Sequence, residues 1–254
     1  MTTYTGDVKY VPGTYATMRP QASDLADRYI REWEKSRLES KEDERQAKIL
    51  PAVCFSRKIG VGALEIADLL AEKIGYKVVD REILEHIANK ADLEERTVAV
   101  FDERYPGEVG EFLSMAFGKK SFIKSDYSKL LFSTVFSIYG LSPTIFVGRG
   151  AHLLLPRDRV LAVRFLSSEE YRAKRLAGIL EIEEKEAGVR IAQIDKEQAD
   201  FFKKVYGKKD ASPYEFDMVV NCDYIKEPEW AAEIVAKAFE RKFGAKTANE
   251  LRNK

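Results

Sequence analysis

The stretch CFSRKIGVGALEIADLLAEKIGYKVVD, Cys54–Asp80, joins four patterns in immediate succession. A strand pattern, AVCFS at Ala52–Ser56, leads into the glycine turn RKIGVG. Apolar residues then recur at helical spacing over Leu64–Ile74, and a second strand pattern, YKVV, follows at Tyr76–Val79. Two short strands joined by a helix predict parallel strands in one sheet.

The same alternation of strand and helix continues toward the C-terminus. Most of the strand patterns are short, β-branched and apolar on both faces, as expected for strands buried between two helical layers. We therefore predict an α/β fold with a five-stranded parallel sheet and helices on both faces. The remaining strand patterns are Thr144–Gly148, Val160–Leu166 and Asp217–Cys222, and the remaining helical patterns are Arg81–Lys90, a group over Leu93–Tyr139, Ser168–Glu184, Ile191–Val205 and Pro228–Phe243.

Residues 1–50 lie outside this alternation. Residues 1–20 show no periodic pattern and are expected to form an irregular arm. A helix with Ser23 as N-cap is predicted from there to about Leu38, followed by a charged connector at 39–48. We favour packing of this helix on the rest of the chain; the alternative is docking to a partner, including a homodimer. Its apolar stripe is Leu25, Tyr29, Ile30 and Trp33.

Composition excludes several classes of function. Lys plus Arg and Asp plus Glu both number 42, so we expect neither a nucleic-acid partner nor an anionic membrane surface. The longest apolar stretch, Leu130–Leu141, is too short to span a bilayer, and the N-terminus does not resemble a secretory signal. Cys54 and Cys222 lie in apolar runs and are expected to be buried thiols. A cytoplasmic protein follows from these observations.

The glycine turn is the first candidate binding site, because ligands of parallel α/β sheets bind at the carboxyl ends of the strands. Gly60 and Gly62 allow positive φ and leave the backbone N–H groups accessible. The start of the next helix adds further free N–H groups and a partial positive charge, so the turn can hold a phosphate. An ordinary glycine-rich turn is the alternative. The expected binding residues are Ser56, Arg57, Lys58, Gly60, Val61, Gly62 and Ala63.

The turn lacks two side chains of the standard phosphate-binding motif G-x-x-x-x-G-K-[ST]. Ala63 replaces the lysine, and Leu64 or Glu65 replaces the hydroxyl residue that binds Mg²⁺. The sequence GKKS at Gly118–Ser121 is not a substitute, since no strand pattern precedes it. We predict that a cation of the loop itself, Lys58 rather than Arg57, replaces the missing lysine.

At this point the chain resembles the cytidylate kinase-like family, a divergent branch of the nucleoside monophosphate kinases. The resemblance rests on SRKIGVGALEIADLLAEKIGYKVVDREIL and on four later segments in the family's order: FDERYPGEVGEFL, IFVGRGAHLLL, VRFLSSEEYRAKRL and IDKEQADFFKKVYGKKDASPYEFDMVVNCD. It covers about Val53–Phe239, and the family pattern also lacks the lysine. The implied domain spans 51–245, with a helical acceptor-side insertion at about 81–140 and a lid at about 177–200.

The resemblance implies ATP as phosphoryl donor, Mg²⁺, and a nucleoside monophosphate such as CMP or dCMP as acceptor. By family position, Arg149 would hold the acceptor's phosphate. Arg175 and Arg190, which would flank the lid, are candidate catalytic cations together with Arg149 and Lys58, and solvated helix charges are the alternative for Arg175 and Arg190. Lys196 stands where the family often has arginine, so a bidentate phosphate contact is lost there. Asp80 and Asp102 are candidate contacts to the acceptor, although a helix-capping role is favoured for Asp80.

Other interpretations stay open from the sequence. The chain could bind a nucleotide without transferring phosphate, as the absent lysine and hydroxyl suggest. It could also phosphorylate a small metabolite other than a nucleotide, because a fold alone does not name the acceptor. His86 and His152 stand far apart without other ligands at metal-binding spacing, so no metal site is predicted.

Overall fold

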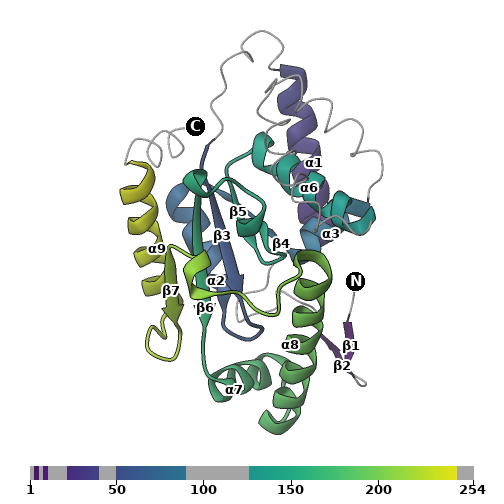
Figure 1. Ribbon diagram of the computed structural model, residues 1–254, viewed down its shortest axis with the longest axis vertical. Coiled ribbons are helices and arrows are strands. Elements are labelled where there is room, and N and C mark those ends of the chain that lie inside the picture. The colour runs from purple at the N-terminus through teal and green to yellow at the C-terminus, as the bar shows by residue number, and fades with distance from the viewer. Residues whose placement is uncertain (1–2, 6–7, 11–21, 40–49, 90–125, 245–254) are drawn as a thin grey trace.

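The computed structural model describes residues 3–5, 8–10, 22–39, 50–89 and 126–244, and its centre is a parallel sheet (Figure 1). The strand order is β4-β5-β3-β6-β7, and every neighbouring pair is parallel. This confirms the predicted five-stranded sheet, with strand ends shifted by at most one residue. The strands are β3 (Ala52–Arg57), β4 (Lys77–Asp80), β5 (Thr144–Val147), β6 (Val160–Leu166) and β7 (Met218–Asn221).

Helices cover both faces of the sheet, and successive strand residues face opposite layers. Val53 and Phe55 of β3 pack into one core, which α2 and α9 cover. Ala52 and Cys54 pack into the other, which is covered by α1, α3, α6 and the end of α8. The bounds are α1 (Ala22–Glu39), α2 (Ala63–Ile74), α3 (Arg81–Asn89), α6 (Asp126–Leu141), α8 (Glu184–Tyr206) and α9 (Pro228–Phe243).

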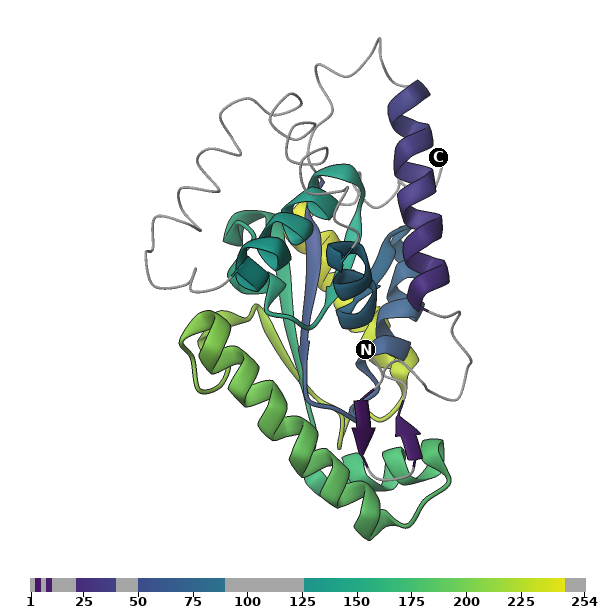
Figure 2. The same ribbon diagram turned by 90° about the vertical axis from the view of Figure 1, so that its right-hand side faces the viewer.

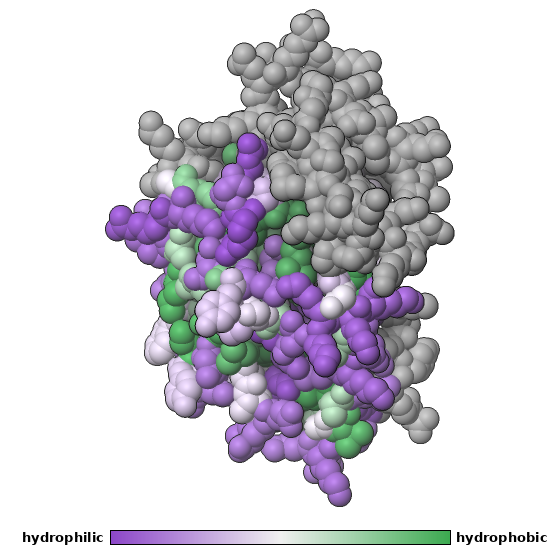
Figure 3. All heavy atoms as spheres, viewed as in Figure 1, coloured by the Kyte–Doolittle hydropathy of each residue, from purple (hydrophilic) through white to green (hydrophobic). Residues whose placement is uncertain are grey.

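A pair of helices, α7 (Glu169–Leu180) and α8, projects from the carboxyl edge of the sheet (Figure 2). The sequence predicted helices at Ser168–Glu184 and Ile191–Val205, and both boundaries between them were wrong. The first helix ends at Leu180, where Glu181 takes the left-handed φ of 56°, and the second already begins at Glu184. Hydrophilic side chains cover much of the lower half of the face in Figure 3, where α7 and α8 lie.

The two projecting helices share a small core of their own. Leu176 of α7 and Ile191 and Ile194 of α8 are buried together, and Ile59 from the glycine turn inserts between them. Leu180 at the end of α7 and Ile182 in the short connection pack against this cluster. The contact explains the early end of α7, since the chain must reverse there for α8 to return across the turn.

The N-terminal segment differs from its prediction in two respects. The expected irregular arm contains two short antiparallel strands, β1 (Thr3–Thr5) and β2 (Val8–Tyr10). Ser23 is not the N-cap of α1, because the helix already includes Ala22. Packing of α1 on the domain is confirmed: Leu25 and Tyr29 are buried in the same core as α3. Homodimerisation through this helix stays a prediction.

Three other expectations can be compared with the structure. Cys54 and Cys222 are both buried and free, as predicted. Of the helical insertion expected at about 81–140, α3 and α6 are described, whereas residues 90–125 lie outside the described residues. No helix in the described ranges has the length and apolar character needed to cross a membrane.

Candidate functional site

The glycine loop, residues 57–62, connects the end of β3 to the start of α2. Gly60 has φ 86° and Gly62 has φ 84°, so both occupy the region that favours glycine. Between and beside them, Ile59 and Val61 are buried and anchor the loop in the core. Ala63 is also buried, so its side chain points into the core and leaves no space there for a lysine. The loop therefore offers backbone and no cation at the motif's usual position.

Helix α7 packs directly on both glycines. A Cβ on Gly60 would lie 3.0 Å from the carbonyl oxygen of Arg172. A Cβ on Gly62 would lie 3.1 Å from Nε and 3.2 Å from Nη2 of Arg175. The Arg175 guanidinium, bonded to Glu65 Oε2 at 2.6 Å, is thus the cation beside the last glycine of the loop. From the sequence, Arg175 is a candidate catalytic cation beside the lid, without a contact to the glycine loop.

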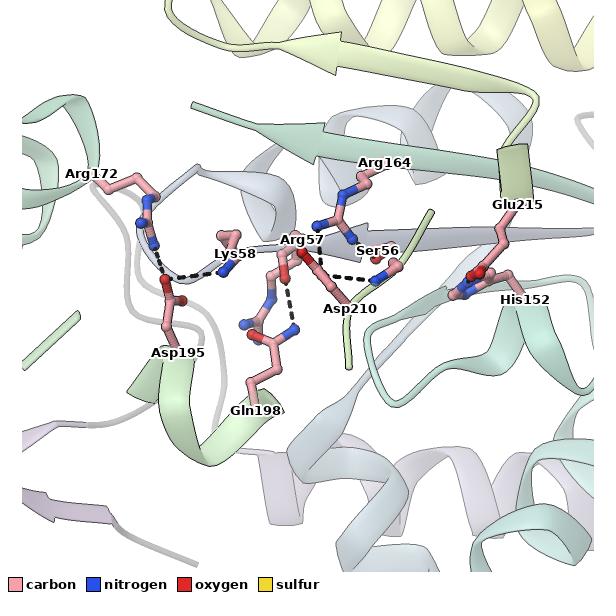
Figure 4. A network of polar contacts seen from close by, with 11 residues as sticks. Ser56, Arg57, Lys58, His152, Arg164, Arg172, Asp195, Gln198, Asp210 and Glu215 are labelled. Atoms are coloured by element: carbon pink, nitrogen blue, oxygen red, sulfur yellow. Dashed lines mark hydrogen bonds and ion pairs between the residues drawn. The ribbon is translucent and has the colours of Figure 1, made fainter. Parts of the chain in front are cut away.

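Lys58, predicted to replace the missing lysine, has a carboxylate partner on α8. Its Nζ lies 3.3 Å from Asp195 Oδ2, and the same oxygen accepts a 2.9 Å hydrogen bond from Nη1 of buried Arg172. Figure 4 shows the Asp195 carboxylate between the two cations. In this arrangement Lys58 connects the loop to α8, and a phosphate could recruit it only by competing with Asp195.

A small cleft of about 100 Å³ opens beside the end of β3. Ser56 is buried and its hydroxyl accepts from Nη1 of Arg164 at 3.2 Å, while Gln198 of α8 donates to the carbonyl of Arg57 at 2.9 Å (Figure 4). Ser56 therefore bonds a neighbouring arginine on β6, and Arg57, whose backbone carbonyl is bonded to α8, lines the cleft.

A second cleft, of about 190 Å³, lies where β3, β4 and β5 end, and we call it the arginine cleft. Three of its lining residues are arginines, Arg57, Arg81 and Arg149, and Phe201 of α8 forms another wall. Burial, followed by the nearby charges of Arg81 and Arg57, lowers the pKa of Arg149 to about 9. Three cations converge here, and an anion would relieve their mutual repulsion.

Arg149 is held on several sides. Its Nη2 pairs with Glu85 Oε1, which also pairs with Arg81 Nε at 3.4 Å. Its guanidinium carbon lies 4.2 Å from the ring centroid of Phe201, a stacking that fixes the plane of the fork. Among the residues that the structure describes, its buried Nε has no hydrogen-bond partner. This buried donor is therefore unsatisfied in the arrangement described.

The segment after Arg149 contains a buried histidine. His152 lies in the short 3₁₀ helix η2 (Ala151–Leu153), and its Nε2 is 3.4 Å from Glu215 Oε2. Its ring packs 4.6 Å from that of Phe216. Burial lowers the pKa of His152 from 6.5 to about 4, although Glu215 opposes the shift. The imidazole is therefore neutral near pH 7 and supports the fold behind the arginine cleft.

The other predicted site residues have separate locations. Asp80 Oδ1 accepts hydrogen bonds from the backbone N–H groups of Glu82 and Ile83, both 3.0 Å, which agrees with the favoured capping role. Arg190 is buried on α8 and pairs with Glu186. Lys196 is exposed on the same helix. None of these three residues lines the arginine cleft, and Asp102 lies outside the described residues.

Several residues at the two clefts were not found from the sequence. Arg81 directly follows a strand at the carboxyl edge of the sheet, and that position alone could have indicated it. Asp195, Gln198 and Phe201 had no comparable signal, because their roles depend on how α8 returns over the loop.

The family comparison agrees with this architecture. A sequence profile described as the cytidylate kinase-like family matches residues 52–224, from the start of β3 to just beyond β7. The chain belongs to the cytidylate kinase-like family. Membership indicates phosphoryl transfer by a P-loop type of kinase, a class that generally uses ATP and Mg²⁺, and leaves the acceptor open. A search of curated proteins gave no significant match.

Solved structures also align with this chain. An uncharacterized protein from Eubacterium ventriosum ATCC 27560 aligns with a TM-score of 0.58 at 16% identity, over 76% of this chain and 99% of its own. Shikimate kinase from Bacteroides thetaiotaomicron aligns with a TM-score of 0.38 at 14% identity, over 75% of this chain and 97% of its own. The first alignment supports the sheet and its helical layers, and at such identity it carries nothing about substrate.

Proposed function

We propose that this protein transfers the terminal phosphoryl group of ATP to an acceptor that already carries a phosphate, a nucleoside monophosphate of the CMP or dCMP type. The observation that carries the proposal is the convergence of Arg57, Arg81 and Arg149 on one cleft at the carboxyl edge of the sheet. A dianionic phosphate complements such a cluster, because Arg149 and Arg81 share the carboxylate of Glu85, whereas a neutral hydroxyl compound adds no negative charge.

The glycine loop supplies the donor side in this proposal. Its backbone N–H groups and the start of α2 would face the triphosphate, with Arg175 beside Gly62 as the neighbouring cation. Arg57 lines both clefts, so the donor and acceptor sides adjoin. In the transfer, an oxygen of the acceptor's phosphate attacks the γ-phosphorus, the bond to the β–γ bridging oxygen breaks, and ADP leaves.

Mg²⁺ fits this site only as an ion held mainly by the nucleotide. No cluster of three metal-ligating side chains occurs in the part of the chain that the structure describes. Glu65, in the first turn of α2, is the carboxylate nearest in sequence to the loop, and Arg175 already orients it. One carboxylate together with phosphates and water is a common Mg²⁺ environment, and the bound ion supplies charge neutralisation.

The test compares matched acceptors. ADP formation should be measured with ATP and Mg²⁺ against CMP, dCMP and other monophosphates, with cytidine as the control that lacks only the phosphate. We expect turnover with at least one monophosphate and none with cytidine. Turnover with neutral compounds but no monophosphate would overturn the assignment of the arginine cleft.

A specific observation favours one alternative, a module that binds nucleotide without transfer. Two cations at the glycine loop are already paired with carboxylates, Lys58 with Asp195 and Arg175 with Glu65. ATP binding measured by calorimetry, together with no ADP formation against any acceptor of the panel, would support that alternative.

A further inference from the structure

Tyr206, the last residue of α8, contacts the arginine turn, which we define as Gly148–Gly150. Its ring is buried, and its hydroxyl donates a 2.6 Å hydrogen bond to the carbonyl oxygen of Arg149. The bond joins residues 57 positions apart in the chain. The end of α8 therefore contacts the backbone of the residue whose guanidinium lines the cleft.

This hydrogen bond acts on a backbone in an unfavourable conformation. Arg149 has φ 51°, between Gly148 at 92° and Gly150 at 71°. A residue with a Cβ is disfavoured in this left-handed region, and it persists only where its surroundings hold it. A fixed carbonyl restricts the peptide plane between Arg149 and Gly150, so the hydroxyl of Tyr206 opposes relaxation of the turn.

The fit between the turn and the ring is a second, independent observation. A Cβ on Gly150 would lie 2.6 Å from Cε2 and 2.8 Å from Cζ of Tyr206. Real Cβ atoms do not approach so closely, because van der Waals repulsion forbids it. The ring thus occupies space that only a glycine at position 150 leaves free.

The ring is itself fixed by the core. It stacks on Phe132 of α6, with centroids 5.8 Å apart and an interplanar angle of 22°, and it contacts Phe202 at 5.4 Å. Gly207 ends α8 directly after it, with φ 66° and its N–H bonded to the carbonyl of Lys203. Burial also raises the pKa of the Tyr206 hydroxyl, which keeps it protonated as a donor.

We infer that Tyr206 is a positioning residue for the acceptor: its hydroxyl holds Arg149 in the left-handed conformation that directs the guanidinium into the arginine cleft, beside Phe201. The inference rests on the proposed function for its kinetic consequence. Its structural consequence, the conformation of Arg149, can be tested without any turnover.

The kinetic experiment compares Tyr206→Phe with Tyr76→Phe. Tyr76 is a matched control, because it is a buried tyrosine whose hydroxyl donates a 2.7 Å hydrogen bond to the carbonyl of Pro51 and whose ring packs on Phe239. Loss of one such bond corresponds to roughly three- to tenfold in an equilibrium. We expect Tyr206→Phe to raise the KM for the monophosphate by about that factor and to leave the KM for ATP unchanged.

The control should lose similar thermal stability with no change in either KM. If both variants shift the acceptor KM equally, or if Tyr206→Phe shifts neither, the positioning role is wrong. Gly150→Ala is a second variant that disturbs the same contact from the other side, and we expect it to raise the acceptor KM as well.

A crystal structure of Tyr206→Phe separates this inference from the proposed function. We expect Arg149 to leave the left-handed region in that variant and to stay there in Tyr76→Phe. If the parent protein phosphorylates no monophosphate, the proposed function fails while this readout still decides the inference. If Arg149 keeps its conformation in Tyr206→Phe, the inference is overturned even in an active kinase.

Discussion

The glycine loop and the arginine turn follow adjacent strands, β3 and β5, and both use positive-φ residues, yet they acquire positive charge differently. In the glycine loop the positive-φ positions are glycines, and the cations come from neighbouring positions, Lys58 and Arg175. In the arginine turn the residue at positive φ is itself the arginine. Charge at the first turn comes from separate elements, whereas at the second turn the turn residue itself carries it, beside Arg57 and Arg81 of the arginine cleft.

The difference has a physical consequence for substitutions. A shared arrangement loses only part of its charge when one cation is removed, because the backbone N–H groups and a second cation stay in place. A concentrated arrangement loses its planar, bidentate donor with a single change. The glycine loop should therefore be sensitive to its backbone, and the arginine turn to its side chain.

The largest effect is expected from Gly62→Val. A branched side chain at φ 84°, within 3.1–3.2 Å of Arg175 for its Cβ alone, displaces both the loop backbone and the neighbouring guanidinium. We expect ATP binding, measured by calorimetry, to be abolished with the fold intact by circular dichroism. Gly188→Ala in α8, where a Cβ meets nothing within 4 Å, is the control and should bind ATP normally. Normal ATP affinity of Gly62→Val would show that the glycine loop is not the ATP site or does not depend on its backbone conformation.

The second effect concerns His152, the buried histidine that follows the arginine turn, at low pH. Because the pKa of His152 is lowered from 6.5 to about 4, the unfolded chain binds this proton at a higher pH than the folded chain. Stability should therefore fall as pH decreases from 6.5 to 4, by on the order of 3 kcal/mol in total.

The measurement is urea unfolding between pH 7 and 4. His152→Gln should flatten the dependence, and His86→Gln, which removes the chain's other histidine, is the control. If the free energy of unfolding of His152→Gln depends on pH as in the parent, His152 does not cause the loss of stability in acid.

Arg149→Ala should weaken the acceptor side by roughly tenfold or more, since a charge-assisted contact contributes about 1.5–3 kcal/mol. The melting temperature should barely move, because Glu85 retains Arg81 and the hydroxyl of Tyr127 as partners. Arg149→Lys keeps the charge without the planar fork and should restore only part of the affinity. A large loss of thermal stability with normal acceptor binding would return Arg149 to a structural role.

The smallest effects are expected for the shared cations of the glycine loop. Lys58→Met should lower ATP affinity by a few-fold and reduce its salt dependence, because Lys58 already has Asp195 as a partner. Arg175→Met should have the larger effect of the two, since its guanidinium lies against Gly62. If Lys58→Met weakens ATP binding more than Arg175→Met, the sequence-based choice of Lys58 is right, and the inference from the position of Arg175 is wrong. If both variants bind ATP with the affinity of the parent at every salt concentration, the backbone N–H groups bind the phosphate without help from either cation.

The fold could be predicted because its signals are local. Val160–Leu166 and Pro228–Phe243 have the bounds that their apolar patterns indicated, and Asp80 caps α3 as expected. The break between α7 and α8 could not be predicted, since no glycine or proline stands at the connection between the two helices. Glu181 takes a left-handed φ there because the packing of Ile59 against α7 and α8 requires the chain to reverse.

The site could be predicted only in part, because its ion pairs join distant segments. The loop and Arg149 were found from their places after strands. The partner of Lys58, Asp195, is 137 residues away in the chain, and Tyr206 reaches Arg149 only through the course of α8. The periodicity and motif spacing of the sequence give no information about either of these two contacts.

The close fit of Gly150 and Tyr206 also constrains the order in which this sequence can evolve. Any side chain at position 150 meets the ring at 2.6 Å, so the tyrosine must become smaller before the glycine can change. Even then φ 71° disfavours most replacements, and asparagine is the residue that tolerates it best after glycine. Single mutations at position 150 should therefore be purged, and accepted changes in descendants should come as ordered pairs, position 206 first.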